Sequence, residues 1–349
     1  MNAADATRNR PAFLITVDTE GDDLWGRPRT ITTRNTACLP RFQRLCEDFD
    51  FKPTWLTNHE MAMDPDFVAF GRDAEHRGTA EIGMHLHAWN SPPLRPLTRD
   101  DFFHQPFLIE YPDEVLDAKI GHMSRLLRER FEGPVVSHRA GRWALNSTYA
   151  QALVRHGYQV DCSVSPHVSW AEVMGDPNGQ GGSDYRGFPD RPYLMDLQHI
   201  DRPGHSPLLE LPVSVLRSRL HRIAPLAYRL PVLRRSAWRH QPDCHWLYPN
   251  GHNLGDLLCV VREAVSTHRP CIELVLHSSE LMPGGSPATR DGASLERLYT
   301  DLRALFTVVA TAFVGMTLAR FRQVWLDSQA QASALPPAFA AQRPMAKAT

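Results

Sequence analysis

Short apolar runs alternate along the chain with longer amphipathic segments. The runs are AFLITV (12–17), KPTWLTN (52–58), AEIGMHLH (80–87), PVVSHRA (134–140), YQVDCSV (158–164), LLELPV (208–213), CIELVLHS (271–278) and AFVGMTL (312–318). Each run has the length of a buried strand. The amphipathic segments, with apolar residues at i, i+3, i+4 and i+7, are 37–49, 66–78, 112–131, 147–158 and 253–268. Strands that alternate with helices predict an α/β fold with a parallel sheet, open or closed into a barrel.

The pattern predicts one large domain with disordered ends. It runs from residue 12 to residue 325 of the 349 in the chain. A long insertion is expected at about 167–250, because its first part is rich in Gly, Pro and Asp and lacks the strand and helix periods. Residues 1–11 are polar, and residues 329–349 are rich in Ala and Pro, so both ends are predicted to be disordered.

Polar side chains with useful chemistry lie at the C-terminal ends of several predicted strands. They are Asp18, His85, Arg139, Asp161 and His277. The carboxyl ends of parallel strands meet at one rim, where the active sites of βα barrels are built. We therefore expect these five side chains to surround one site.

Two histidines in EIGMHLHAW (81–89) lie two residues apart. Both imidazoles of His85 and His87 should face the same side of the strand, and imidazole is a good zinc ligand. The competing interpretation is that one of the two is structural and the other lies in a loop. A pair of carboxylates at the end of another strand favours the metal site.

Those carboxylates lie in VDTEGDD (17–23). Asp18 follows the strand directly, and Glu20 faces the same way by strand alternation. Asp22 and Asp23 are better candidates for surface charge, because Gly21 and Asp residues favour a turn. A solvated acidic loop is the alternative for the whole stretch.

The stretch SHRAGRWALN (137–146) carries an Arg at another strand end. Arg139 can hold a carboxylate ionised by paired hydrogen bonds. Gly141 suits a close approach of the backbone to a ligand, and Trp143 can form an apolar wall for a sugar ring. Asn146 or Ser147 is predicted to cap the following helix.

Charge and composition limit the classes of binding partner that we expect for the protein. The net charge of −1 gives no general attraction to nucleic acid, and the six cysteines show no CxxC pair that would indicate a zinc ribbon. The polar N-terminus lacks a secretion signal, so we expect a cytoplasmic location. The basic segment 217–239 is most simply a solvated face. Its alternative role is contact with the diphosphate of a lipid- or nucleotide-linked sugar, or peripheral membrane contact at the inner face of the membrane.

Taken in order, the motifs VDTEGD, EIGMHLHAW, HRAGRWALN, VDCSVSP and LVLHSSEL resemble those of the polysaccharide deacetylases of the NodB-homology type, carbohydrate esterase family four. The resemblance covers about residues 12–325 and is closest to the WalW-like branch associated with lipopolysaccharide biosynthesis. It implies a distorted (β/α) barrel of about seven strands, one divalent metal ion with zinc as the first choice, and hydrolysis of an N-acetyl group on a sugar.

The resemblance also assigns roles. Asp18 resembles the general base, Arg139 the group that orients it, His277 the general acid, Asp161 the residue that tunes His277, and His85 the first metal histidine. Two positions depart from the family pattern. Thr19 stands where the metal aspartate is usual, so Glu20, with Asp22 behind it, is the expected ligand. Trp89 stands where the second histidine is usual, so His87 is the expected substitute.

Substrate contacts are predicted for Trp89, Arg142 and Trp143, with a backbone N–H near Arg142 or Trp143 facing the oxyanion. The expected substrate is an N-acetylated sugar of a cell-envelope polysaccharide or of its lipid- or nucleotide-linked precursor. Two alternatives stay open. One is a non-catalytic glycan-binding protein on the same barrel, which the irregular metal motif supports. The other is a glycoside hydrolase that uses Asp18 and Glu20, which leaves the histidines unexplained.

Overall fold

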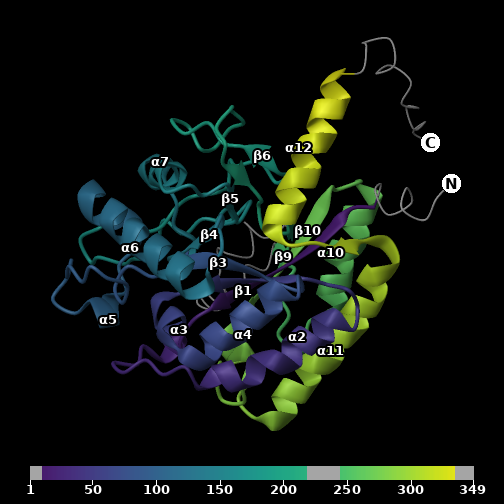
Figure 1. The fold of residues 1–349 in the computed structure, drawn as a ribbon, viewed down its shortest axis with the longest axis horizontal. Helices are drawn as coiled ribbons and strands as arrows, with labels where there is room; N and C mark the ends of the chain where they lie inside the picture. The colour runs from purple at the N-terminus through teal and green to yellow at the C-terminus, as the bar shows by residue number, and fades with distance from the viewer. Residues whose placement is uncertain (1–9, 218–243, 335–349) are drawn as a thin grey trace, which may run out of the picture.

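A curled, mostly parallel sheet forms the centre of the molecule (Figure 1). The computed structural model describes residues 10–217 and 244–334. The strands of this sheet are β1 (Ala12–Thr19), β2 (Pro53–Thr57), β3 (Glu81–Leu86), β4 (Ser137–Ala140), β5 (Val160–Asp161), β6 (Tyr193–Leu194), β7 (Leu209–Glu210), β10 (Cys271–His277) and β11 (Val314–Gly315). Their order is β10-β1-β2-β3-β4-β5-β7-β6, with β11 paired to β1. The described sheet is a half-barrel, with β10 and β6 at the two ends of this path.

The seven neighbouring strands from β10 to β7 all run parallel. The expected α/β fold and distorted barrel are therefore confirmed, and every predicted apolar run contains a strand. The antiparallel edge strand β6 was not predicted, because its short sequence shows no period. A separate two-stranded sheet pairs β8 (Val215–Arg217) with β9 (Cys244–Trp246).

Helices cover the sheet from outside. They are α2 (Leu39–Glu47), α3 (His59–Met63), α4 (Pro65–His76), α5 (Asp101–His104), α6 (Asp113–Phe131), α7 (Ser147–Arg155), α10 (Leu254–Ser266), α11 (Gly292–Ala312) and α12 (Leu318–Ala334). Each of the five amphipathic segments contains one of them. Two of these five helices begin at a side-chain cap: Asp64 at α4 and Asn146 at α7 accept hydrogen bonds from backbone N–H groups of the first turn.

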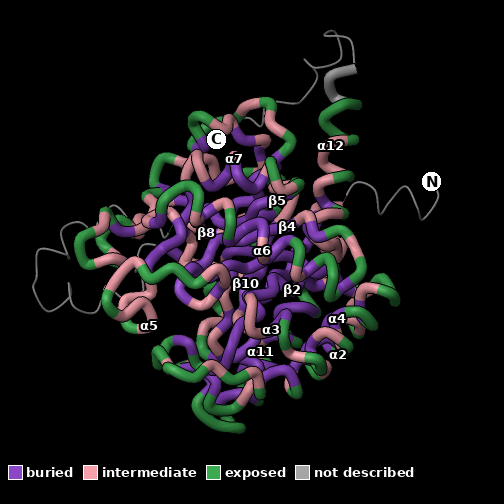
Figure 2. The backbone as a smooth tube through the Cα atoms, turned by 60° about the vertical axis from the view of Figure 1, so that its left-hand side comes forward, coloured by how far each residue is buried: buried purple, intermediate pink, exposed green. Residues whose placement is uncertain are grey.

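The strands at the centre of the molecule, such as β2 and β4, are buried (Figure 2). Strand β1 is also buried on both faces, and its alternating residues lie in two different apolar clusters. Phe13, Ile15 and Val17 belong to the large core beneath the helices. Ala12 and Leu14 belong to a second apolar cluster shared with β2, β5 and β7. Because side chains alternate along a strand, Thr16 and Asp18 lie on the face of Ala12 and Leu14. The catalytic candidate Asp18 thus lies at the carboxyl end of a strand that is buried along its whole length, and this burial fixes the position of Asp18.

The structure adds three details to the predicted domain boundaries. Helix α12 continues to Ala334, so residues 329–334 of the predicted tail are helical, since Ala has the highest helix propensity; residues 335–349 lie outside the described residues. Arg10, in the predicted N-terminal tail, donates hydrogen bonds to the carbonyls of Ala310 and Phe313. The predicted insertion contains β7, which belongs to the main sheet.

Most of the basic segment 217–239, to which a membrane contact was assigned, lies outside the described residues. Within residues 10–217 and 244–334, no helix combines the length and the apolarity needed to cross a bilayer. None of the six cysteines, all of which lie within residues 10–217 and 244–334, forms a disulfide.

Candidate active site

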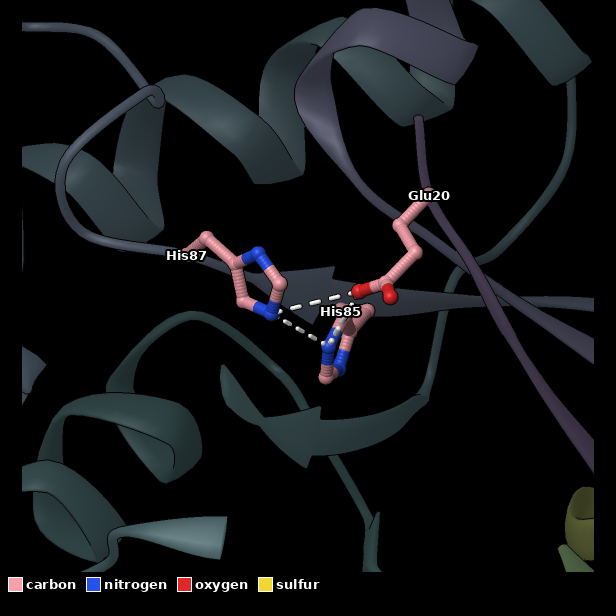
Figure 3. A group of neighbouring side chains, drawn as sticks. All are labelled: Glu20, His85 and His87. Carbon is pink, nitrogen blue, oxygen red and sulfur yellow. Dashed lines mark hydrogen bonds and ion pairs between the residues drawn. The ribbon is translucent and has the colours of Figure 1, made fainter. Parts of the chain in front are cut away.

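Three predicted metal ligands meet at the carboxyl ends of β1 and β3 (Figure 3). The Nε2 atoms of His85 and His87 lie 2.9 Å apart, and Glu20 Oε2 lies 3.6 Å from the first and 3.3 Å from the second. All three side chains are buried. They form the one group of this kind found among the described residues.

The spacing of these atoms fits a metal ion. Tetrahedral zinc with ligand bonds of about 2.0–2.1 Å keeps its donor atoms roughly 3.3 Å apart, close to the separations seen here. His85 Nδ1 lies 3.1 Å from the Arg139 carbonyl, an arrangement in which Nδ1 donates its proton and Nε2 keeps a lone pair for the ion. Two imidazoles and a carboxylate are also a known donor set of catalytic zinc sites. The residues present therefore fit a divalent ion.

The position of His87 depends on two neighbours. Gly141 lies so close that a Cβ added to it would be 2.5 Å from His87 Cδ2 and 2.4 Å from the Leu86 carbonyl, so only glycine fits there. Trp89 stacks on the His87 imidazole, with ring centroids 4.3 Å apart, and is itself buried. Trp89 therefore supports His87 from behind and does not face a substrate, which corrects its predicted role. Burial lowers the pKa of His87 well below its usual value, so the ring is neutral and able to bind a metal.

Asp18 lies beside the metal group and is held by Arg139. Arg139 Nη1 donates to Asp18 Oδ1 at 2.6 Å, while Nη2 donates to Thr16 Oγ1 and to Glu273. Burial raises the pKa of Asp18, but the positive charges of Arg139, His85 and His277 outweigh it, so the pKa lies below the usual value. The ionised form of Asp18, the form a general base needs, is therefore stable near neutral pH.

His277 approaches Asp18 from the neighbouring strand. The two residues are register partners in β10 and β1, and His277 Nε2 lies 3.7 Å from Asp18 Oδ2. On its other side, His277 Nδ1 lies 3.5 Å from Glu280 Oε2 and 3.3 Å from the Tyr248 hydroxyl, which donates to Glu280. Burial lowers the pKa of His277, but the hydrogen bond of Glu280 and the charges of Glu20, Glu280 and Asp18 raise it to about 9. At neutral pH the ring holds the proton that a general acid donates.

Asp161 does not contact His277, so its predicted tuning role is wrong. Its register partner on the adjacent strand is His138, and Asp161 Oδ1 lies 2.6 Å from His138 Nδ1. Its carboxylate also accepts hydrogen bonds from Ser163. Burial raises the pKa of Asp161, but the hydrogen bond and the charge of His138, together with the hydrogen bonds from Glu210 and Ser163, outweigh burial and the pKa is lowered. Asp161 thus stabilises β4 and β5 from within, and Glu280 takes the place beside His277.

Asp22 is not a metal ligand either. Its two carboxylate oxygens accept hydrogen bonds from Thr32 Oγ1, from Arg34 N and Nε, and from Asn35 N. Because both oxygens are already used, Asp22 fixes the loop that follows Glu20. Its expected surface role is also wrong, since the residue is buried.

Arg142 and Trp143 follow β4 in a tight turn, each with a positive φ. The guanidinium of Arg142 donates to the carbonyls of Gln105 and Met174 and lies 4.1 Å from the Phe107 ring centroid, so it fixes loops rather than pointing to a substrate. Trp143 is half-buried and lines a cleft, as a substrate wall would. Its ring lies 4.8 Å from the guanidinium carbon of Arg139.

The cleft has a volume of about 1770 Å³ and opens beside the proposed acid. Its lining includes His277, Glu280, Tyr248, Trp25 and Trp143. Trp25 contacts the His277 ring edge-on, with centroids 4.9 Å apart. A substrate in the cleft would therefore reach His277 directly.

Several site residues were not predicted from the sequence: Tyr248, Glu280, His138, Glu273 and Trp25. Glu280 carried the only clear signal, because it follows His277 by three residues inside the motif LVLHSSEL. The others act through strand register and loop packing, which a single sequence does not display.

Comparison with known proteins gives no match to a protein-family model and none to a curated protein. Among solved structures, a proposed polysaccharide deacetylase from Mycobacterium smegmatis has a TM-score of 0.52 at 13% identity, over 98% of this chain and 96% of the other. A 4-alpha-glucanotransferase from Thermococcus litoralis has a TM-score of 0.51 at 13% identity, over 90% of this chain and 40% of the other. At this identity the likeness shows the fold alone, and the two descriptions differ in activity.

A proposed polysaccharide deacetylase is thus among the structural neighbours that share this fold, and the WalW-like branch stays a prediction. The chain has the curled (β/α) fold that the M. smegmatis protein shares, and at its carboxyl rim it brings together a potential metal-binding group, a buried Asp–Arg pair and a histidine.

Proposed function

We propose that the chain is a metal-dependent hydrolase that removes the acetyl group from an N-acetylated sugar. The observation that carries the proposal is the buried group of Glu20, His85 and His87, which lies beside an acid–base pair. Asp18 is ionised and can accept a proton, whereas His277 is protonated and can donate one. Zinc is the proposed ion, since this donor set is found in catalytic zinc sites. The resemblance of the motifs adds the proposal that the sugar belongs to a cell-envelope polysaccharide or to its lipid- or nucleotide-linked precursor.

In this mechanism Glu20, His85 and His87 would hold the ion, and the chemistry it would supply when bound is that of a Lewis acid, polarisation of an amide carbonyl and a lowered pKa of water. Asp18 accepts the proton of the attacking water, and Arg139 keeps Asp18 ionised and fixes the direction of its free oxygen. His277 donates a proton to the departing amine, with Glu280 and Tyr248 holding its ring from behind. The products are acetate and an amino sugar.

The same geometry disfavours the glycoside hydrolase alternative. That reaction needs one carboxyl group that carries a proton, but Arg139 holds Asp18 ionised and Glu20 is turned toward the two histidines. The non-catalytic alternative predicts that the protein holds no metal. A measurement of metal content therefore distinguishes it from the proposed hydrolase.

We expect the dialysed protein to contain about one divalent ion per chain, most of it lost in His87→Ala, because the variant removes one of three ligands. Metal content by plasma mass spectrometry tests this. His199→Ala is the matched control, since His199 is exposed and outside the site. Equal metal content in His87→Ala and the wild type would exclude this ligand set, and no metal in any of the proteins would favour the binding-protein alternative.

We also expect a rate that falls as the pH rises through about 9, because His277 acts as an acid only while protonated. Glu280→Gln removes the hydrogen bond and the charge that raise the pKa of His277, so the fall should move to lower pH. The test is acetate release from an N-acetylated sugar between pH 6 and about 10. An unchanged alkaline limb in Glu280→Gln would show that Glu280 does not control His277.

A further inference from the structure

We propose that Asn58 and Glu60, which follow β2, are positioning residues of the metal site: their side chains hold together the two chain segments that carry Glu20 and His87. The inference rests on the proposed function, because it assigns this pair to the metal site of the proposed hydrolase. It explains how the protein fixes two ligands that lie beyond the ends of their strands.

Two of the three ligands lie outside the hydrogen-bonded part of the sheet. Strand β1 ends at Thr19 and β3 ends at Leu86, so Glu20 and His87 each lie one residue past a strand. The register pairs of these strands also stop at Thr19 and Leu86, so contacts other than the sheet ladder must fix the two ligands. In Figure 3 the two side chains approach the site from different segments of the chain.

Asn58 holds the turn that carries His87. Strand β2 lies between β1 and β3 in the sheet, and Asn58 is the first residue after it. The Asn58 side chain is fully buried, and its Oδ1 accepts hydrogen bonds from His87 N at 3.4 Å and from Ser91 Oγ at 3.3 Å. Ser91 N donates to the His87 carbonyl at 3.2 Å and closes the turn. Both ends of the turn 87–91 are therefore attached to one amide. The backbone N–H of Asn58 donates to the Thr19 carbonyl at 2.9 Å, directly before Glu20.

Glu60 joins that turn to the segment of Glu20. Its Oε1 accepts a hydrogen bond from Gly21 N at 2.7 Å, and its Oε2 accepts one from Asn90 Nδ2 at 2.9 Å. Asn58 Nδ2, which lies 3.3 Å from Oε1, holds the carboxylate between the two loops. Gly21 follows Glu20 directly, and Asn90 lies within the turn of the second ligand. One carboxylate therefore ties together the segments of two ligands that come from different strands.

Other contacts hold each segment on its own. The Glu20 carbonyl accepts hydrogen bonds from Ser278 Oγ and from Asn35 Nδ2. Lys119 Nζ donates to the carbonyl at the end of the turn 87–91. Glu60, in contrast, contacts both segments. Its loss should leave the two loops folded but their separation less fixed. Because an ion needs its ligands at set distances from one another, metal affinity should be the first property to change.

The test measures zinc affinity of the full chain by competition with a chromophoric chelator, and the absorption spectrum of the cobalt-loaded protein. Buffer at about pH 8 keeps Glu60 ionised, because burial raises its pKa to about 7. We expect Glu60→Ala to weaken zinc binding about tenfold or more and to change the cobalt spectrum, which reports the coordination geometry.

Two further variants separate positioning from folding. Glu60→Gln should stay close to the wild type, because its carbonyl can accept from Gly21 N and its amide can donate to Asn90 Oδ1, which has no hydrogen-bond partner among the described residues. Glu114→Ala is the matched control, since it makes the same substitution in the first turn of α6 at an exposed position. Asn58 is not varied, because it also caps α3.

Asn90→Ala tests the link from its other end. It removes the donor to Glu60 at a half-buried position and should also weaken zinc binding. In the double variant Glu60→Ala/Asn90→Ala, the second change should cost little, because its partner is already absent. If Glu60→Ala does not fold, as its unfolding midpoint shows, Asn90→Ala decides alone.

Wild-type zinc affinity in either folded variant would overturn the inference and leave the proposed hydrolase standing. Additive losses in the double variant would also overturn it, and so would equal losses in Glu60→Gln and Glu60→Ala, since the charge of Glu60 and not its hydrogen bonds would then act on the ion. A wild-type protein that binds no zinc would refute the proposed function itself, and the inference with it.

Discussion

Replacing Asp18 with Asn should lower the turnover number for acetate release by about a hundredfold or more, the usual scale for the loss of a general base. Asparagine has nearly the same shape and can still accept the hydrogen bond from Arg139, but it cannot take a proton from water. The expected loss is therefore chemical. Initial rates at saturating substrate measure it.

The controls separate chemistry from folding. Asp23→Asn is the same substitution five residues away, at an exposed position, and should keep the full rate. Metal content should stay unchanged in Asp18→Asn, because Asp18 is not one of the three ligands. A thermal unfolding midpoint shows how far the buried Arg139 tolerates a neutral partner. Full activity in a folded Asp18→Asn variant would contradict the role of Asp18 as the base.

The location of the candidate site, at the carboxyl ends of the parallel strands, could be predicted from the sequence. Apolar runs located the strands, and parallel topology requires that their carboxyl ends meet at one edge. Strand alternation placed Glu20 with Asp18 and His87 with His85, and the structure brings Glu20, His85 and His87 within ligand distance of one another. These predictions worked because they need only the direction and period of a strand.

The partners of buried polar groups could not be predicted in the same way. Asp161 pairs with His138 because the register of β5 against β4 puts the two residues opposite each other, and register depends on packing over the whole sheet. Asp22 is used by the loop backbone at Asn35, whose path is set by contacts distant in sequence. The predicted roles of Asp161 and Asp22 were both wrong for the same reason. Each carboxylate was assumed to be available to the active site, whereas it is already hydrogen-bonded to other groups.

Trp89 illustrates a related limit. Trp89 lies three residues beyond the end of β3 at Leu86, in a segment where the chain turns, so the strand period does not say what its indole contacts. The indole stacks on His87 at 4.3 Å and supports the ligand instead of contacting the substrate. Strand alternation still placed Glu20 and His87, each one residue past its strand, but it does not give the contacts of a side chain farther into the loop.

Replacing His277 with Gln should lower amide hydrolysis by about a hundredfold or more, because an amine leaves the tetrahedral species only when it is protonated. Glutamine keeps the polarity of the site but holds no acidic proton. The alkaline fall in rate near pH 9 should disappear together with the group that titrates. Acetate release from an N-acetylated sugar, measured against pH, tests both effects. His205→Gln is the matched control at an exposed position.

A second substrate distinguishes two causes of activity loss in His277→Gln, the absence of a proton donor and a distorted active site. In an aryl acetate ester with a nitrophenol leaving group, the leaving oxygen departs as an anion and needs no proton. Loss of His277 should therefore cost much less on this ester than on the amide, whereas Asp18→Asn, which removes the base, should cost a similar factor on both substrates. Equal losses on ester and amide in His277→Gln would show that His277 positions the site and does not donate the proton. Unequal losses would assign the base to Asp18 on β1 and the acid to His277 on β10. These two residues are register partners, so the proposed chemistry depends on the pairing of these two strands.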